Sequence, residues 1–547
     1  MPVDQDQVQA LLKRHEWLVA ERRSHESLWR QCERWVDPYQ QGGFYKLSPG
    51  YQRDQHLTDD TAVAGLETFV AAMQAMLLPD GEQVTKLLTT DTSLNDMPKV
   101  QRWLAKAADR LHACRNAPHT GFASQSPLRW RQLGIYGTSA FWTDENIGRG
   151  LSYRTLHLSE IFIDDDFRGM VDTIHRRFRL SARAIAQMFH DDAVMMCPKV
   201  AEALSKGKVD EKFHVIHVVR PNSHWEPGRM DIDGYPIQSL YLIEEDKTLV
   251  SAKGFYSPPL AVSRYTLAPN DPYGVGPTAM KIGTIKMLNQ MGHDYIRATH
   301  LNLSPPVLVP EGGAFNRMSM TPGAGIPGGM EGGRRQMEPF MAGVQTAYAE
   351  KAMASYQASV EKVFLTNAFA IMQEPIDRQT ATEYLGRKRE AMALQAPNVG
   401  RQLAEALTPQ VAREMDILLR AGQIDPPPGE LLEARAGLRY EFVNPFTTAA
   451  KSGEAQQFLT GLQALEPMAQ IDASVMDVID TDAAPRGVML ALGVRPDWLA
   501  DPDVVMAKRQ QRQQQQQQEQ LTTAAPALTQ SMLNMAQAGK AAGIAPA

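Results

Sequence analysis

The sequence has few cysteines and no pattern that would join them. Cys32, Cys114 and Cys197 are widely spaced, odd in number and without a CxxC pair, which argues against a disulfide framework and a zinc knuckle. The chain also lacks an uncharged apolar run of about 18 residues, so we expect no membrane span. Met1–Arg14 is polar and charged, so we expect no secretion signal. These absences favour a soluble chain that is made inside the cell.

Motifs for nucleotide hydrolysis and for common hydrolases are missing too. The sequence contains no G-x-x-x-x-G-K-[ST], H-E-x-x-H or G-x-S-x-G pattern. Its 13 histidines show no metal-ligand spacing. His214 and His217 have no acidic or cysteine neighbour nearby in sequence, so we expect ordinary strand residues there. We therefore predict a protein that is not an enzyme and uses no cofactor, so a partner must supply any energy for moving a substrate.

Positive charge is not in excess. Lysine and arginine number 56 against 62 acidic residues, which gives a net charge of −6 and excludes the basic surface of a DNA coat. Any contact with nucleic acid must be local or weakly adhesive. At 547 residues the chain exceeds one ordinary core, and we expect about three or four domain-sized units.

The first half of the chain predicts helices followed by strands. Short β runs dominate from Gly137 to about Tyr265, interrupted by one helix at Ser181–Phe189 whose serine is a plausible cap. The overall expectation is an α+β fold that is predominantly α. The expected earlier helices are Val8–Trp35, Thr61–Leu78, Val100–Arg115 and Ser126–Tyr136, and the β runs are Leu156–Ile163, Val171–Phe178, His214–Val219 and Ser239–Ile243.

The middle of the chain predicts two long helices around an irregular excursion. The first opens at Pro277, which suits a first helical turn, and runs to about Asn302. The second, from about Pro339 to Met372, repeats apolar residues every four positions, and each step overshoots a turn by about 40°. Its stripe winds around the helix and needs partners on more than one side. Because the pair buries little alone, we expect other copies to complete it as a ring. The stripe consists of Val344, Tyr348, Ala352, Tyr356, Val360 and Phe364.

Glycine and proline punctuate what surrounds these helices. Val307–Val309 is a candidate short strand, and Glu311–Met337 is too rich in glycine and proline to be regular helix. After a break at Glu374-Pro375, a third helix is expected over Ala381–Gln395. Pro397 interrupts that helix before its pattern resumes to Arg420. Several short helices over Asn444–Trp498 and an exposed helix at Lys508–Gln520 complete the prediction.

Two motifs invite a chemical interpretation. Gly274-Val275-Gly276-Pro277-Thr278-Ala279 matches a loose dinucleotide pattern, but a turn precedes it and proline removes an N–H, so a tight helix entry is favoured. Asp164-Asp165-Asp166 offers carboxylates for Mg²⁺, whereas an exposed acidic turn explains the same residues more simply.

Basic residues in the middle of the chain have two interpretations. They are candidates for phosphate contact, or they are solvated or subunit-pairing charges. In a ring of identical subunits, each lysine or arginine is repeated as a circle of positive charges. A few such circles on a mostly acidic channel wall let a polyanion slide. Arg378, beside Asp377 and Glu374, is best placed to protrude into a lumen. The other candidates are Lys281, Lys286, Arg297, Arg334 and Arg335.

Together these stretches resemble the portal proteins, or head-to-tail connectors, of short-tailed T7-like bacteriophages. The resemblance spans about four hundred residues in a consistent order, and none of its motifs is catalytic. The motifs are Asp59-Asp60-Thr61, Tyr136-Gly137-Thr138-Ser139-Ala140, Arg264-Tyr265, Tyr273-Gly274-Val275-Gly276-Pro277, Ser304-Pro305-Pro306, Arg378-Gln379-Thr380-Ala381-Thr382-Glu383 and Arg420-Ala421-Gly422.

The resemblance implies a dodecameric ring around a channel at one capsid vertex. Double-stranded DNA would pass through it, driven by the terminase large subunit during packaging, and leave through it at ejection. On this sequence it implies a wing over residues 1–276, stem helices over 277–304 and 339–372, and a clip over 305–338. It further implies a tunnel loop over 373–380, a long broken helix of wing and crown over 381–443, a crown over 444–507 and a Gln/Ala-rich tail over 508–547.

The same resemblance implies residue roles and partners. Glu374, Asp377, Arg378 and Gln379 would lie in the tunnel loop, and Arg317, Arg334 and Arg335 would belong to the docking surface of the clip. Further partners would be a tail adaptor, the major capsid and scaffolding proteins and internal core proteins. The protein would reside in the virion, after assembly in the host cytoplasm. Two alternatives remain open: another virion assembly protein such as an adaptor or scaffold, and a metal-dependent DNA-processing enzyme that uses Asp164–Asp166.

Overall fold

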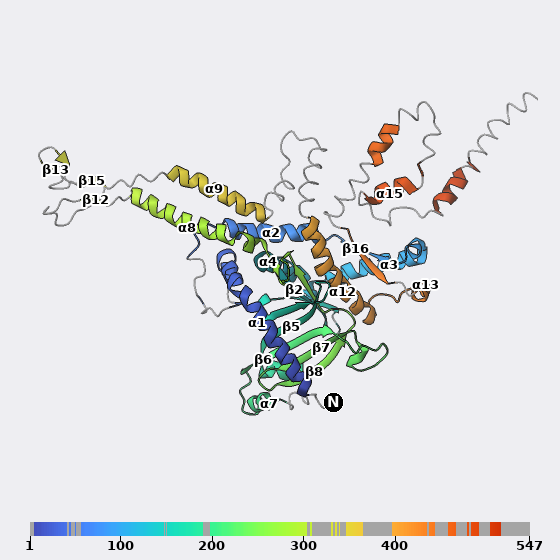
Figure 1. The fold of residues 1–547 in the computed structure, drawn as a ribbon. Coiled ribbons are helices and arrows are strands. Elements are labelled where there is room, and N and C mark those ends of the chain that lie inside the picture. The colour runs from blue at the N-terminus through green and yellow to red at the C-terminus, as the bar shows by residue number, and fades with distance from the viewer. Residues whose placement is uncertain are drawn as a thin grey trace, which may run out of the picture. The chain divides into compact units, whose positions relative to one another are not determined.

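The computed structural model describes residues 5–40, 43–44, 50, 56–146, 148, 150–189, 197–303, 307–308, 330–331, 334–335, 338–339, 346–364, 396–434, 437–443, 458–465, 479–480, 483–491, 504–512 and 514–515. The chain divides into two compact units, Met1–Phe446 and Thr447–Ala547. The first unit combines long helices with antiparallel sheets, in agreement with the predicted α+β class (Figure 1). Its helices and strands account for most of the predicted elements.

A five-stranded antiparallel sheet forms one part of this unit, in the order β4-β5-β6-β7-β8. The helix α1 (Gln5–Val36) packs on one face, where Val8 and Leu11 join Ile216 and Val218 in a buried cluster. The neighbouring Val215 points to the opposite face and joins the core under α5 (Ala182–Met188) and α7 (Pro198–Ser205). The strands are β4 (Ile161–Asp165), β5 (Val171–Ser181), β6 (Lys212–Pro221), β7 (Ile237–Ile243) and β8 (Thr248–Phe255).

The main core surrounds a three-stranded sheet in the order β3-β2-β9. Trp130 and Phe141 are fully buried at its centre. The strands are β2 (Thr138–Asn146), β3 (Gly150–Leu156) and β9 (Leu260–Arg264). Helices that contribute to this core include α2 (Thr61–Leu77), α3 (Pro98–Arg115), α4 (Phe122–Tyr136) and α12 (Thr408–Arg420).

One strand pair was missed by the sequence analysis. β1 (Thr85–Thr89) pairs with β16 (Leu438–Phe442), so residues about 350 positions apart lie side by side. The predicted helix at Ser181–Phe189 is confirmed as α5, and the Ser181 side chain accepts a hydrogen bond from Ala184 N at 3.3 Å as its cap.

Three glycines allow the start of α8 (Pro277–Leu303) to cross the end of α4. Gly137 ends α4 at φ 80°, and a Cβ atom there would lie 2.2 Å from Gly276 N. A Cβ on Gly274, in β11 (Gly274–Val275), would lie 2.2 Å from Gly137 O. Pro277 is the first residue of α8, and Thr278 Oγ1 donates to Gly134 O at 2.8 Å. The short strand β10 (Thr266–Leu267) pairs with β11. The glycine pattern thus forms the tight helix entry that the sequence favoured.

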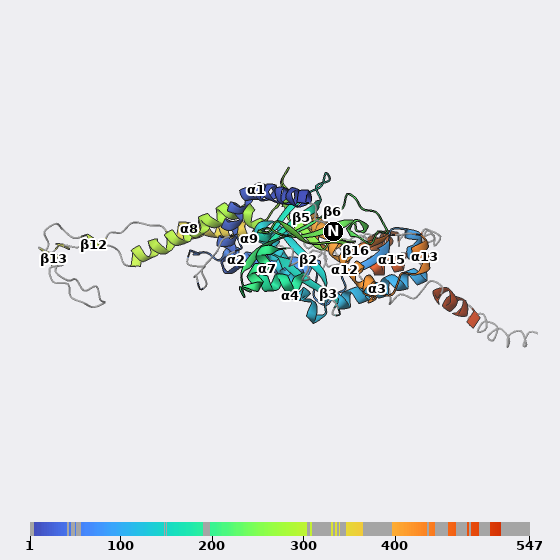
Figure 2. The ribbon, with the colours of Figure 1, turned by 90° about the horizontal axis from the view of Figure 1, so that it is seen from below.

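α8 and α9 (Thr346–Val363) project together from the sheets (Figure 2). The predicted strand at Val307–Val309 is confirmed as β12 (Val307–Leu308). It pairs with β15 (Glu338–Pro339), so the predicted start of the second long helix at about Pro339 is wrong. The pairing of β12 with β15 decides the structure at Pro339, and the described helix begins at Thr346. β13 (Met330–Glu331) pairs with β14 (Arg334–Arg335).

The described chain resumes after α9 at residue 396. Residues 396–402 are helical, Leu403–Leu407 form a π-helical turn, and α12 follows to Arg420 as predicted. Pro397 lies in the first of these segments, and the sequence analysis did not predict the π turn. The predicted break at Glu374-Pro375 and the predicted helix at Ala381–Gln395 lie outside the described residues. The short helix α13 (Gly429–Glu433) comes after α12.

The second unit contains short helices, as predicted. Residues 458–465, α15 (Ala483–Ala491) and residues 504–512 are helical. The exposed helix expected at Lys508–Gln520 is described only to residue 515. Across the described parts of both units, no helix has the length and apolar character that a membrane span requires.

Candidate functional site

The candidate site is the projecting pair of α8 and α9 together with the segments that anchor it. Two hydrogen bonds join the antiparallel helices: Lys281 Nζ donates to Ser359 Oγ at 3.0 Å, and Tyr295 OH donates to Glu350 Oε1 at 2.7 Å. The first lies near the body of the unit and the second lies farther along the pair. The two helices therefore form one arm.

Residues at the start of α2 anchor this arm. Asn289 Oδ1 accepts from Thr58 N at 2.9 Å and from Asp59 N at 3.1 Å. Gln357 Nε2 on α9 donates to Asp59 Oδ2 at 2.7 Å. A Cβ on Gly292 would lie 2.7 Å from Thr58 Oγ1, so glycine permits this close approach. Both helices of the arm are thus fixed at one point, which includes part of the Asp59-Asp60-Thr61 motif.

Burial changes along the arm. Ile285 and Leu288 are 1% exposed, but none of the described α8 residues after Gly292 is buried. Beyond that point Ile296 is 46% exposed and Leu303 is 76% exposed. The far part of α8 therefore carries exposed apolar side chains that the described residues leave uncovered.

The apolar stripe predicted for the second long helix differs in burial along α9. Val360 and Phe364 are completely buried, whereas Tyr348 is 77% exposed and Tyr356 is 37% exposed. One end of the stripe packs on the body of the unit, and the other end faces away from it. Among the described residues of the stripe, Tyr348 and Tyr356 thus remain exposed to solvent.

The predicted channel charges occupy different environments. Lys281 is half-buried and bonded to Ser359, Lys286 donates to Gln31 Oε1 on α1, and Arg297 is exposed. The first two side chains therefore have partners within the chain. β14 contains Arg334 and Arg335 as a strand. Arg317, Glu374, Asp377, Arg378 and Gln379 lie outside the described residues.

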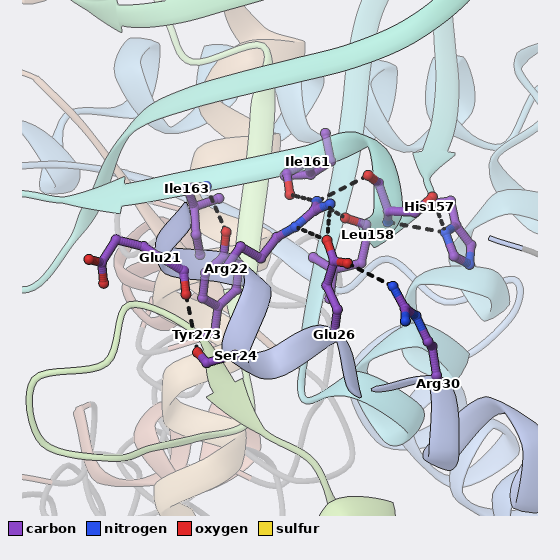
Figure 3. Close-up of polar contacts among 11 residues, drawn as sticks. Glu21, Arg22, Ser24, Glu26, Arg30, His157, Leu158, Ile161, Ile163 and Tyr273 are labelled. Carbon is purple, nitrogen blue, oxygen red and sulfur yellow. Dashed lines mark hydrogen bonds and ion pairs between the residues drawn. The ribbon is translucent and has the colours of Figure 1, made fainter. Parts of the chain in front are cut away.

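A buried arginine joins α1 to the segment before the five-stranded sheet (Figure 3). Arg22 Nη1 donates to the carbonyls of Leu158 at 3.0 Å, Ser159 at 3.0 Å and Ile161 at 2.7 Å. Its other nitrogens bond Glu26. Burial lowers the pKa of Arg22, and the nearby carboxylate partly opposes this effect.

The same region contacts the entry to α8. Tyr273 OH accepts a hydrogen bond from Ile163 N at 3.2 Å, and burial raises the pKa of this hydroxyl to about 12 (Figure 3). Because Tyr273 lies just before the glycine crossing, α1, β4 and α8 share one rigid junction. The sequence analysis did not find this junction, since nothing in the sequence relates Arg22 to carbonyls about 140 residues away.

Residues considered for catalysis have structural partners. Asp164 pairs with Arg14, and Asp166 Oδ1 accepts from Arg168 N at 2.8 Å and Met170 N at 2.9 Å. These bonds form the acidic turn that the sequence favoured. Over the part of the chain that the structure describes, no group of three or more His, Cys, Asp or Glu residues is arranged to hold a metal ion.

The two strand histidines also have structural roles. His214 Nδ1 lies 2.8 Å from Glu245 Oε1, an acidic partner that sequence proximity did not indicate. His217 stacks on Tyr241 with ring centroids 3.9 Å apart, and burial lowers its pKa to about 3. Both are ordinary strand residues, as expected.

The described part of the site is a projecting helical arm fixed to an α+β body. Residues 8–499 match the family model for the bacteriophage head to tail connecting protein. The chain therefore belongs to this family.

Two relatives from phages are similar over about nine tenths of their length. The chain is 24% identical over 526 residues to a probable portal protein of Bordetella phage BPP-1. This match covers 93% of this chain and 91% of the relative. It is 23% identical over 510 residues to the portal protein of Salmonella phage epsilon15, with 91% and 90% covered. The predicted resemblance to phage portal proteins is confirmed.

Among solved structures, a chain from the virion of a native gene transfer agent particle aligns with 80% of this chain and 90% of its own length. The identity is 12% and the TM-score is 0.36, a likeness too weak to define the fold.

Proposed function

We propose that copies of this chain form a closed ring around a channel at one capsid vertex, through which double-stranded DNA enters and leaves. The observation that carries this proposal is the uncovered apolar surface of the arm formed by α8 and α9. In a ring each arm has a neighbour on either side, which matches a stripe that winds around its helix. Cyclic symmetry closes such contacts without leaving an open end.

The arm serves as the stem in this proposal. Residues 277–304 contribute its first helix, and the second range, 339–372, contributes its second helix from Thr346 onward, after Pro339 in strand β15. Residues 1–276 form the wing, 305–338 the clip, 373–380 the tunnel loop, 381–443 the broken helix behind it, and 444–507 the crown. Twelve copies would form the ring. The clip, with Arg317, Arg334 and Arg335, would dock the terminase large subunit first and the tail adaptor later.

The protein's own contribution is geometric and electrostatic. The stem sets the bore, while Arg297 and the tunnel-loop residues Glu374, Asp377, Arg378 and Gln379 present charge to the DNA. Lys281 and Lys286 keep intrachain partners and contribute positive potential to the stem. The terminase supplies the energy of packaging, so the chain acts without catalysis in the virion.

A charge on the uncovered part of the arm tests the proposal. Ile296→Glu should convert rings to monomers, because a carboxylate at the subunit contact would lose solvation without gaining a partner. Met230→Glu is the matched control, since Met230 is 102% exposed outside the arm and should leave assembly unchanged. Mass photometry measures both distributions. Rings that persist in Ile296→Glu at the control's abundance would refute the assignment of the arm to the subunit contact.

A further inference from the structure

The helix that begins the described chain after α9 is interrupted by one π-helical turn. Thr408 N–H bonds the carbonyl of Leu403, five residues earlier, and Thr408 Oγ1 donates to the same oxygen at 2.8 Å. Single π turns inside α-helices are frequent at functional sites. Here the turn separates residues 396–402 from α12.

A buried ion pair holds the turn to β9. Glu405 Oε1 accepts from Arg264 Nη2 at 2.9 Å, while Oε2 accepts from Arg264 N at 3.0 Å and Nε at 3.2 Å. Arg264 is 1% exposed and Glu405 is 8% exposed. Gln402 Nε2 adds a hydrogen bond to Arg264 O at 2.8 Å. Three bonds to Glu405 and one from Gln402 thus fix this part of the helix to one residue.

A second buried cluster holds α12. Glu414 accepts from Arg115, from Tyr153 OH at 2.7 Å and from Gln410 Nε2 at 2.7 Å. Arg129 Nη1 donates to Gln410 Oε1 at 2.8 Å. Burial beside this carboxylate raises the pKa of Tyr153 well above its ordinary value. Buried polar partners therefore hold this helical stretch at Gln402 and Glu405 and again at Gln410 and Glu414.

The π turn makes the two clusters compatible. Gln402 and Glu405 are three positions apart, and Gln410 and Glu414 are four apart, so each pair lies on one helical face. Glu405 and Gln410 are five apart, which in an uninterrupted α-helix would separate them by about 140°. Because a π turn bonds residue i to i+5, it returns Gln410 toward the face that Glu405 uses.

We propose that Arg264 and Glu405 are a positioning pair that retains the π turn and so sets the rotation of residues 396–402. Without the pair the turn can relax to α-helix, which rotates these residues by about 100° relative to α12 and shifts them by about 1.5 Å. The chain before residue 396 includes the segment that we assign to the tunnel loop. Resting on that proposed function, the pair fixes residues 396–407, which belong to the broken helix that we assign behind the tunnel loop.

Two matched variants test this role by hydrogen exchange of the assembled protein. Glu405→Gln should raise amide exchange in residues 396–407 about tenfold or more and leave residues 408–420 within about twofold. Glu414→Gln, which disrupts the cluster on the other side, should show the reverse pattern. Equal effects of both variants along residues 396–420 would overturn the proposal, because the turn would then not separate two units.

Two further measurements complete the test. Should Glu405→Gln fail to fold, Arg264→Lys keeps the charge but loses the bidentate contact, and it should give the same local pattern with a smaller amplitude. A cryo-electron microscopy map of a folded variant should show residues 403–407 as α-helix, and a retained π turn would count against the pair. Faster amide exchange limited to residues 396–407 in Glu405→Gln, together with unchanged DNA retention, would contradict the tunnel-loop assignment. It would leave the positioning role of the pair intact.

Discussion

Gly137→Ala should destabilise the protein through the crossing between α4 and α8. The residue has φ 80°, and an added Cβ would lie 2.2 Å from Gly276 N, 2.4 Å from Val275 C and 2.5 Å from Gly274 O. A left-handed conformation alone costs an alanine about 1–2 kcal/mol. The neighbours are backbone atoms and cannot rotate away, so the crossing must open, at about 1–3 kcal/mol by analogy with overpacked cores.

Gly207→Ala separates these two contributions. Gly207 has φ 72° but no atom within 4 Å of an added Cβ, so this variant should lose only the conformational part, about 1–2 kcal/mol. Gly137→Ala should lose about 2–5 kcal/mol in total. Urea unfolding followed by tryptophan fluorescence gives both values, with Trp130 buried near the crossing. A Gly137→Ala variant no less stable than Gly207→Ala would refute the argument that the glycines exist for close approach.

Two further predictions concern pH and DNA. His15 and His175 are stacked between α1 and the five-stranded sheet, and burial lowers their pKa values to about 4 and about 3. The unfolded chain therefore takes up protons that the folded chain does not, so stability should fall from about pH 6.5 downward, for His15 by about 3 kcal/mol near pH 4. Urea unfolding of His15→Leu should show a weaker decrease than the native chain between pH 6.5 and 4, and an identical decrease would contradict the prediction. Arg378→Ala should leave ring assembly intact but reduce DNA retained in particles, because it removes channel charge rather than core. Unchanged DNA content, measured by nuclease protection, would refute that role.

Helical periodicity in the sequence predicted most of the long helices. The buried positions of α1 and α2 recur at helical spacing, and proline or glycine marks several helix boundaries. The predicted start of α9 was wrong because Pro339 pairs in β15 with a strand about 30 residues earlier, a contact that local periodicity does not indicate. Local pattern identifies a helix more reliably than it locates the helix ends.

Long-range pairing explains what the sequence did not show. β1 and β16 are five-residue strands far apart in the chain, and Glu405 meets Arg264 only after folding. The π turn has no residue signature, because its extra residue is determined by the partners on either side. Arg264-Tyr265 was noted as part of the family resemblance, but the structural role of the arginine required its partner in space.

Cryo-electron microscopy of the purified full-length chain tests the central claim most directly. The account predicts a closed ring of twelve copies with the paired α8 and α9 helices side by side around an open axis wide enough for a DNA duplex. A monomer whose exposed Ile296, Leu303 and Tyr348 are covered by its own chain, or a solid or helical assembly without a channel, would contradict it.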